Sequence, residues 1–146
     1  IQIANPMSEN YEYVRPSIIP SLLESESMSA QAIYPHHRFE VGKVAYLDED
    51  DNSGTVTKNH LGFLSAASDM GFNQLSSYIA TLLYYLRVEY VMSELVDPRF
   101  IPGRCGNIVV DGKSVGIFGE IHPQVLDSWN ITIPTIACEI DLDNFI

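Results

Sequence analysis

Basic residues are scarce in this chain of 146 residues, in which eight lysines and arginines stand against 19 aspartates and glutamates. The net charge is −11. Proteins that bind nucleic acid neutralise its phosphates with a basic face. A broad nucleic-acid-binding surface is therefore not expected on this chain.

Long hydrophobic runs are also missing. No stretch approaches the roughly 18 apolar residues of a transmembrane helix, and no basic segment followed by an apolar one begins the chain, as in a secretion signal. The two cysteines, Cys105 and Cys138, are expected as buried thiols in a reducing compartment. We therefore expect a cytoplasmic protein with no membrane contact. Because the chain starts at Ile1, already in a strand-like run, we expect one domain, residues 1–146, within a longer protein.

What the chain does have is an apolar content of 46%, sufficient for a packed core at this length. Its most informative stretch runs from Cys105 to Trp129. Two runs rich in β-branched residues flank Asp111-Gly112, a two-residue hairpin signal. Gly116 and Gly119 allow a bend or close backbone approach. Pro123 then suits the first turn of a short helix that reaches about Trp129.

The remaining elements follow from periodicity and turn signals. A helix is expected from Ser17, as its cap, to about Met28, with Pro20 in its first turn. Apolar residues at helical spacing predict a second helix from Phe72 to Leu86. Strands are expected over residues 1–5, 38–47, 60–67, 88–92 and 135–142, with an acidic turn at 48–54 and an irregular connection at 97–104.

Several antiparallel strands with about three interspersed helices, and no βαβ alternation, indicate an α+β fold. We expect an antiparallel β-sheet with the helices packed on one of its faces.

Candidate reactive groups are few. His36-His37, His60 and His122 lack the spacing of a closed metal site, and the acidic turn lacks the terminal Glu of an EF-hand. We therefore predict no metal ligands, no cofactor-binding residues and no catalytic residues. A carboxylate at Glu120 is interpreted as stabilising the helix that starts at Pro123. The alternative is an independent small enzyme or ligand-binding domain with a cleft built around Glu40, Glu120 and His122.

Five motifs occur in the order found in one known family. They are Asn5-Pro-Met-Ser8, Arg15 and Ser17 with Pro20-Ser-Leu-Leu23, Tyr34-Pro35 with Phe39-Glu-Val-Gly42, Phe100-Ile-Pro-Gly-Arg104, and Gly119-Glu-Ile-His-Pro123. Together they resemble the β subunit of phenylalanyl-tRNA synthetase in its archaeal and eukaryotic form. Pro16 and Ser21 depart from the family pattern, which puts the length of the first helix in question.

The resemblance implies the class II aminoacyl-tRNA synthetase core fold and a role inside a phenylalanine–tRNA ligase, an α2β2 heterotetramer in the cytoplasm. In that family the α subunit performs aminoacylation with ATP and Mg²⁺. The β core packs against α and has little direct contact with tRNA(Phe). By analogy with the class II dimer interface, the surface that meets α is expected to include Asn5, Pro6, Arg15, Ser17, Pro20, Leu22 and Leu23.

A class II active site needs two arginines to neutralise ATP phosphates. Arg38-Phe-Glu40 superficially resembles the element that carries the first. The candidate second element, Gly116 to His122, offers Glu and His instead, and no arginine follows Arg104. The sequence therefore predicts that this domain is non-catalytic on its own.

Overall fold

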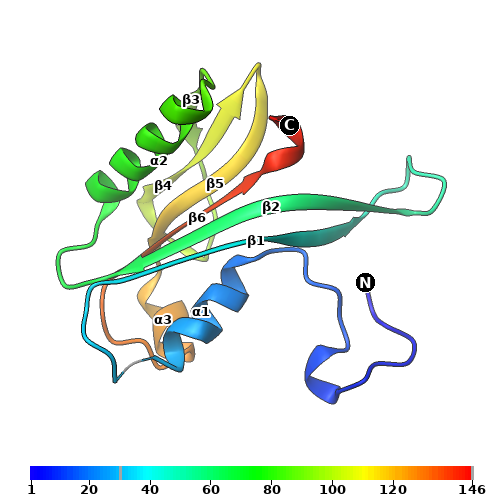
Figure 1. Cartoon of the computed structure of the whole chain (residues 1–146), viewed down its shortest axis with the longest axis horizontal. Helices are drawn as coiled ribbons and strands as arrows, with labels where there is room; N and C mark the ends of the chain where they lie inside the picture. The colour runs from blue at the N-terminus through cyan, green and yellow to red at the C-terminus, as the bar shows by residue number, and fades with distance from the viewer. Residues whose placement is uncertain (30, 146) are drawn as a thin grey trace.

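Six antiparallel strands form one sheet in the computed structural model, which describes residues 1–29 and 31–145 (Figure 1). The strand order is β1-β2-β6-β5-β4-β3. The strands are β1 (His36–Leu47), β2 (Thr55–Ala66), β3 (Val91–Glu94), β4 (Phe100–Val110), β5 (Lys113–Ile121) and β6 (Thr135–Asp141).

In the described part of the chain three α-helices accompany the sheet: α1 (Ile19–Ser27), α2 (Phe72–Leu86) and α3 (Pro123–Ser128). Two short 3₁₀ turns lie at Glu9–Tyr11 and Leu142–Asn144. The predicted α+β class, with an antiparallel sheet and three helices, is confirmed.

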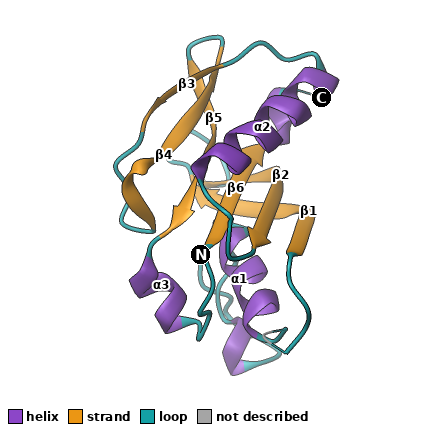
Figure 2. Cartoon of the chain, turned by 90° about the vertical axis from the view of Figure 1, so that its left-hand side faces the viewer, coloured by secondary structure: helices purple, strands orange, loops and turns teal. Residues whose placement is uncertain are grey.

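The helices lie on both faces of the sheet, so the prediction that they share one face is wrong (Figures 1 and 2). Helix α1 packs on one face in a core that includes Leu64, Ala137 and, from α3, Leu126. Helix α2 packs on the other face against Ile136 and Cys138. Neighbouring residues of β6 thus enter different cores, because side chains alternate across a strand. Strand β6 is accordingly buried on both sides, from Thr135 to Ile140.

The hairpin at Asp111-Gly112 is confirmed, with both residues at positive φ. Close approach at Gly119 is confirmed as well: a Cβ there would lie 2.6 Å from Cβ of Cys105 and 2.7 Å from the Phe100 ring. Strand β6, expected only as the last strand, lies in the middle of the sheet between β2 and β5.

Three other predictions are wrong. Residues 1–5 form one isolated bridge, Gln2 to Tyr13, rather than a strand. The predicted strand at 88–92 begins only at Val91. The segment 97–104, expected to be irregular because of its prolines and glycine, contains the start of β4. Its pairing with β5 shifts register between Phe100 and Cys105, and such an irregularity accommodates residues that an unbroken ladder excludes.

Candidate functional site

The N-terminus of α1 is held by a carboxylate from the middle of the sheet. Glu139 of β6, only 5% exposed, accepts hydrogen bonds from the backbone N–H of Ile18 at 3.0 Å and of Ile19 at 3.3 Å. The Ser17 hydroxyl donates to the same carboxylate at 2.5 Å. Ser17 is thus not the N-cap residue, which is Ile18. Glu139, 120 residues away in sequence, satisfies the unpaired N–H groups of the first turn instead.

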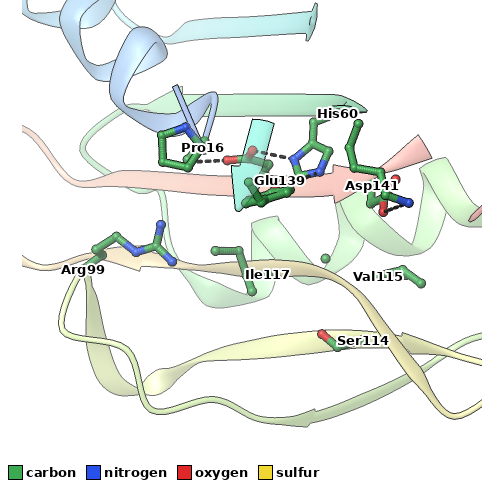
Figure 3. A pocket seen from close by; sticks show the side chains of 12 residues that line it. Pro16, His60, Arg99, Ser114, Val115, Ile117, Glu139 and Asp141 are labelled. Carbon is green, nitrogen blue, oxygen red and sulfur yellow. Dashed lines mark hydrogen bonds and ion pairs between the residues drawn. The ribbon is translucent and has the colours of Figure 1, made fainter. Parts of the chain in front are cut away.

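A histidine and a tyrosine extend this cluster. Nδ1 of His60 lies 2.7 Å from Oε1 of Glu139, and the Tyr46 hydroxyl lies 3.2 Å from Nε2 of the same ring. Figure 3 shows Glu139 and His60 turned toward each other on neighbouring strands. Burial, together with the nearby charges of Glu139 and Asp141, raises the pKa of Tyr46 to about 12. Tyr46 therefore stays protonated at neutral pH and serves as a hydrogen-bonding group rather than a nucleophile.

A cavity of about 330 Å³ opens beside the cluster. Its wall carries charges of both signs: Lys58 and Arg99 are cationic, and Glu139 and Asp141 are anionic. Arg99, Glu139 and Asp141 are labelled in Figure 3. Most of these charges are already paired. The Arg99 guanidinium donates to Asp97, and Lys58 Nζ lies 3.6 Å from Asp141.

The pKa of Glu139 is lowered from its ordinary value. Burial by itself raises that pKa, but the hydrogen bonds from His60, Ser17 and the N–H groups of Ile18 and Ile19 outweigh it. The ionised form is the one that caps α1. A carboxyl whose folded-state pKa is depressed stabilises the fold above its unfolded-state pKa.

This shift predicts a pH dependence of folding. The difference in unfolding free energy between the wild-type chain and Glu139→Gln should be largest at neutral pH. It should shrink as the pH falls below about 4, where the unfolded carboxyl and then the folded one take up a proton. Urea unfolding of both chains between pH 7 and pH 3 measures it. A difference that grows toward acid pH would contradict this sign.

The other end of α1 has a second buried carboxylate. The side chain of Glu26 is fully buried and lies 2.7 Å from Nδ1 of His36, and Nε of Arg38 donates to it at 2.8 Å. Arg38 also donates to the Ser25 hydroxyl at 3.1 Å. The ring of Tyr34 stacks on His36 with centroids 4.1 Å apart. Arg38, the candidate for an ATP phosphate, thus has its guanidinium bound to α1, and the residues present do not form a phosphate site around it.

Glu40, Glu120 and His122 are not brought together. Glu40 lies on the α1 face of β1 and pairs with Arg15. Glu120 lies on the α2 face of β5, and β2 and β6 separate the two strands. His122 follows β5 and accepts a hydrogen bond from the N–H of Gln124. The predicted cleft is therefore not formed.

Glu120 does stabilise a helix, but not the expected one. Its Oε1 accepts from the N–H of Phe72 at 2.8 Å, in the first turn of α2, and its Oε2 accepts from Arg104 at 2.9 Å. The cap of α3 is His122. The sequence analysis assigned the Glu120 carboxylate to the helix that follows it in the chain. In the structure β5 directs this carboxylate to α2, whose Phe72 lies 48 residues upstream.

The seven residues predicted to contact the α subunit differ in their exposure to solvent. Asn5, Pro6 and Pro20 are exposed, whereas Arg15 and Ser17 are half-buried and bonded to Glu40 and Glu139. Leu22 and Leu23 lie in the α1 core at 4% and 3% exposure. The interface itself stays a prediction, and it depends on the five residues that retain exposed surface.

Among residues 1–29 and 31–145, no group of three His, Cys, Asp or Glu side chains is arranged to hold a metal ion. In the same described ranges, no helix is long and apolar enough to cross a membrane.

The six-stranded antiparallel sheet with helices on both of its faces has the fold of the class II aminoacyl-tRNA synthetase core. The pyrrolysyl-tRNA synthetase PylSc of Desulfitobacterium hafniense superposes with a TM-score of 0.69 over 90% of this chain and 48% of that one, at 14% identity.

The chain belongs to the family of phenylalanyl-tRNA synthetase β chain CLM domains, whose sequence model matches residues 1–142. It is 49% identical over 142 residues to the phenylalanine–tRNA ligase β subunit of Treponema pallidum, covering 97% of this chain and 24% of that one. The corresponding β subunit of Borrelia garinii is 44% identical over 146 residues, or 100% of this chain and 26% of that one. The chain thus spans about a quarter of these relatives, and the resemblance found in its motifs is confirmed.

Proposed function

We propose that this domain acts inside the β subunit of a cytoplasmic phenylalanine–tRNA ligase as a non-catalytic core that packs against the catalytic α subunit. The whole assembly, an α2β2 heterotetramer, then charges tRNA(Phe) with phenylalanine. The relatives named above carry this activity in their names. ATP and Mg²⁺ are proposed to act at the α subunit.

The observation that carries the non-catalytic role is the state of Arg38. Its guanidinium donates to Glu26 and Ser25 at 2.8 and 3.1 Å, so that it anchors α1. The second phosphate-binding arginine of a class II site is also missing, because no arginine follows Arg104 in the sequence. Stabilisation of phosphate charge by preorganised cations is the main requirement for forming an adenylate. In this domain the guanidinium of Arg38 binds helix α1, at the position where an adenylate-forming site would have an arginine that binds a phosphate.

The packing role draws support from the segment that precedes α1. Met7, Tyr11 and Tyr13 are exposed by 106%, 67% and 65%. Large apolar side chains gathered on one segment mark interaction sites. The segment also contains Asn5, Pro6 and Arg15, three of the residues predicted to meet α.

A binding measurement tests the packing role. Full-length β chain mixed with the α subunit of the same organism should elute as one complex in size-exclusion chromatography. The double variant Tyr11→Glu/Tyr13→Glu should weaken that complex by at least tenfold, because it buries two charges in the interface. The matched control is Tyr84→Glu/Tyr85→Glu, two tyrosines 77% exposed on α2, which should leave binding unchanged. If both double variants bound the α subunit equally well, the N-terminal segment would not be part of the interface.

A separate measurement tests the non-catalytic role. Phenylalanine-dependent exchange of pyrophosphate into ATP should be absent for the β chain alone and present for the αβ complex. Exchange by the β chain alone would overturn the proposal.

A further inference from the structure

Helix α2 covers only part of the sheet face on which it lies. Its buried side chains pack against β4, β5 and β6, in a core to which, in the described ranges, β1 and β2 contribute no fully buried residue. Strand β1 forms the border of the sheet, next to β2 only (Figure 2). The α2 side of these two strands is therefore left without a covering layer.

Two rows of apolar side chains cross the sheet on this side. Cα pairing places Phe39, Phe63 and Cys138 in one row and Val41, Leu61 and Ile140 in the next, because paired residues of antiparallel strands project to the same face. The inner members, Cys138 and Ile140, are 0% and 1% exposed beneath α2, whereas the outer members, Phe39 and Val41, are 77% and 59% exposed. The apolar surface thus continues past α2 to the edge of the sheet. We call Phe39, Val41, Leu61 and Phe63 the uncovered face.

Helix α2 borders the uncovered face with tyrosines and without charge. Tyr78 lines an open cavity of about 680 Å³ between α2 and this face, and Tyr85 lies two turns further along the same side of the helix. The ring of Tyr84 packs edge-on against Tyr85, with centroids 5.6 Å apart. None of the 15 residues of α2 is charged, although charged residues make up 18% of the chain. Interface cores are depleted of charge and enriched in tyrosine, so this surface has the composition of a protein-binding one. We call Tyr78, Tyr84 and Tyr85 the tyrosine ridge.

The exposed area of this surface approaches that of a stable interface. Phe39, Tyr84 and Tyr85 are each 77% exposed, and Tyr78 is 38% exposed. At about 200 Å² per aromatic side chain, these four rings expose about 500 Å². Val41, Leu86 and the partly buried side chains of the cavity bring the total toward the roughly 800 Å² that each partner contributes to a standard interface.

We propose that a second copy of this chain covers this surface, with the tyrosine ridge of each copy lying in the cavity of the other about a two-fold axis. An isologous interface needs a patch that complements itself, and here the ridge and the cavity lie side by side on one molecule. The proposal does not depend on contact with the α subunit.

Local charge favours a second copy over a partner of opposite charge. The net charge of −11 opposes self-association, so two copies meet most favourably where neither brings a carboxylate. Glu40 lies on the opposite face of β1, paired with Arg15. The charged residue that follows the uncovered face on the same side of β1 is Lys43, opposite Asn59. A strongly basic partner would find no carboxylate on this surface to bind.

Sedimentation velocity of the 146-residue chain tests the proposal. A reversible dimer is expected at concentrations of about 10–100 µM, within the weak end of the affinities of standard interfaces. Raising the salt concentration from about 0.1 M to about 1 M shortens the Debye length from about 10 Å to about 3 Å. Because salt then screens the repulsion between the two acidic copies, the dimer should become at least threefold tighter. A monomer throughout, a dimer that weakens at high salt, or open-ended oligomers would each overturn the proposal.

Variants with matched charge locate the interface. Phe39→Lys should weaken the dimer at least tenfold, even though it lowers the net negative charge, because it places a charge on the uncovered face. Leu47→Lys is the control, since Leu47 is 76% exposed on the same strand, about 26 Å further along it. It makes the same change in charge and should not weaken the dimer. Equal weakening by both variants would overturn the placement. Unchanged thermal unfolding of each variant shows that the fold is intact.

Mixing two variants tests the two-fold arrangement. Tyr85→Glu should also weaken the dimer at least tenfold on its own. A mixture of Phe39→Lys and Tyr85→Glu chains at low salt should form a mixed dimer, because the new lysine of one copy then faces the new glutamate of the other. Pairing in the mixture no stronger than in either variant alone would overturn the ridge-in-cavity arrangement.

The Tyr84→Glu/Tyr85→Glu variant separates this proposal from the proposed function. It should lose the dimer of this chain and still bind the α subunit. Loss of both kinds of binding would place α, rather than a second copy, on the tyrosine ridge and would overturn the present proposal.

Discussion

Replacing Glu139 by alanine should lower the free energy of unfolding by about 3–5 kcal/mol, the range found when one member of a buried polar cluster is removed. The change leaves the N–H groups of Ile18 and Ile19, the Ser17 hydroxyl and the His60 ring without their acceptor. Water cannot replace that acceptor easily, because Glu139 is 5% exposed. Urea unfolding at pH 7 measures the loss.

Asp141→Asn is the matched control for this variant. Asp141 lies two residues further along the same strand, with 20% of its side chain exposed and Lys58 at 3.6 Å. A partly exposed ion pair of this kind contributes about 0–1 kcal/mol, and asparagine can still accept the hydrogen bond from the N–H of Asp143. If Glu139→Ala lowered the free energy of unfolding by no more than the control does, Glu139 would not stabilise the fold by capping α1.

Glu26→Ala should be comparably damaging, at about 3–5 kcal/mol. Its carboxylate is fully buried, and its loss leaves the Arg38 guanidinium, 24% exposed, without its charged partner inside the protein. His36 loses its hydrogen-bond partner at the same time. The measurement is again urea unfolding, with far-UV circular dichroism to follow the helices.

The control for Glu26 lies on the same helix. Glu24 is exposed, and Glu24→Ala should change the free energy of unfolding by no more than about 0.5 kcal/mol. Since both substitutions remove one carboxylate from α1, the comparison separates the buried contact from helix propensity and net charge. Similar small losses for the two variants would mean that Arg38 and His36 find new partners when Glu26 is absent.

These two glutamates explain how a helix of nine residues keeps a fixed position on the sheet. Isolated helices of this length are marginal in water. Glu139 reaches the first turn of α1 from β6, and Glu26 reaches from the last turns of α1 to β1. The segment that is proposed to contact the α subunit leads directly into this clamped helix. Its placement therefore depends on both buried carboxylates.

The sequence predicted the elements that depend on local chemistry. The hairpin was predictable because Asp111-Gly112 readily adopts the positive φ of a tight turn. Helix α2 was predictable because Leu75, Ile79 and Leu83 recur at helical spacing and form one apolar face. The family resemblance was equally available, because its five motifs are short and each lies within one stretch of the chain. The α+β class followed from the order of these elements.

The tertiary structure alone decided which face each helix covers and which carboxylate meets which helix. Glu120 and Glu139 look alike in the sequence, as single acids in apolar runs. Strand pairing delivers the first to α2 and the second to α1, across 48 and about 120 residues. It also placed β6 in the centre of the sheet and left β1 at its edge. Such contacts depend on strand order and on the two-residue alternation of side chains, and neither the order nor the choice of face is encoded in any one stretch of the chain.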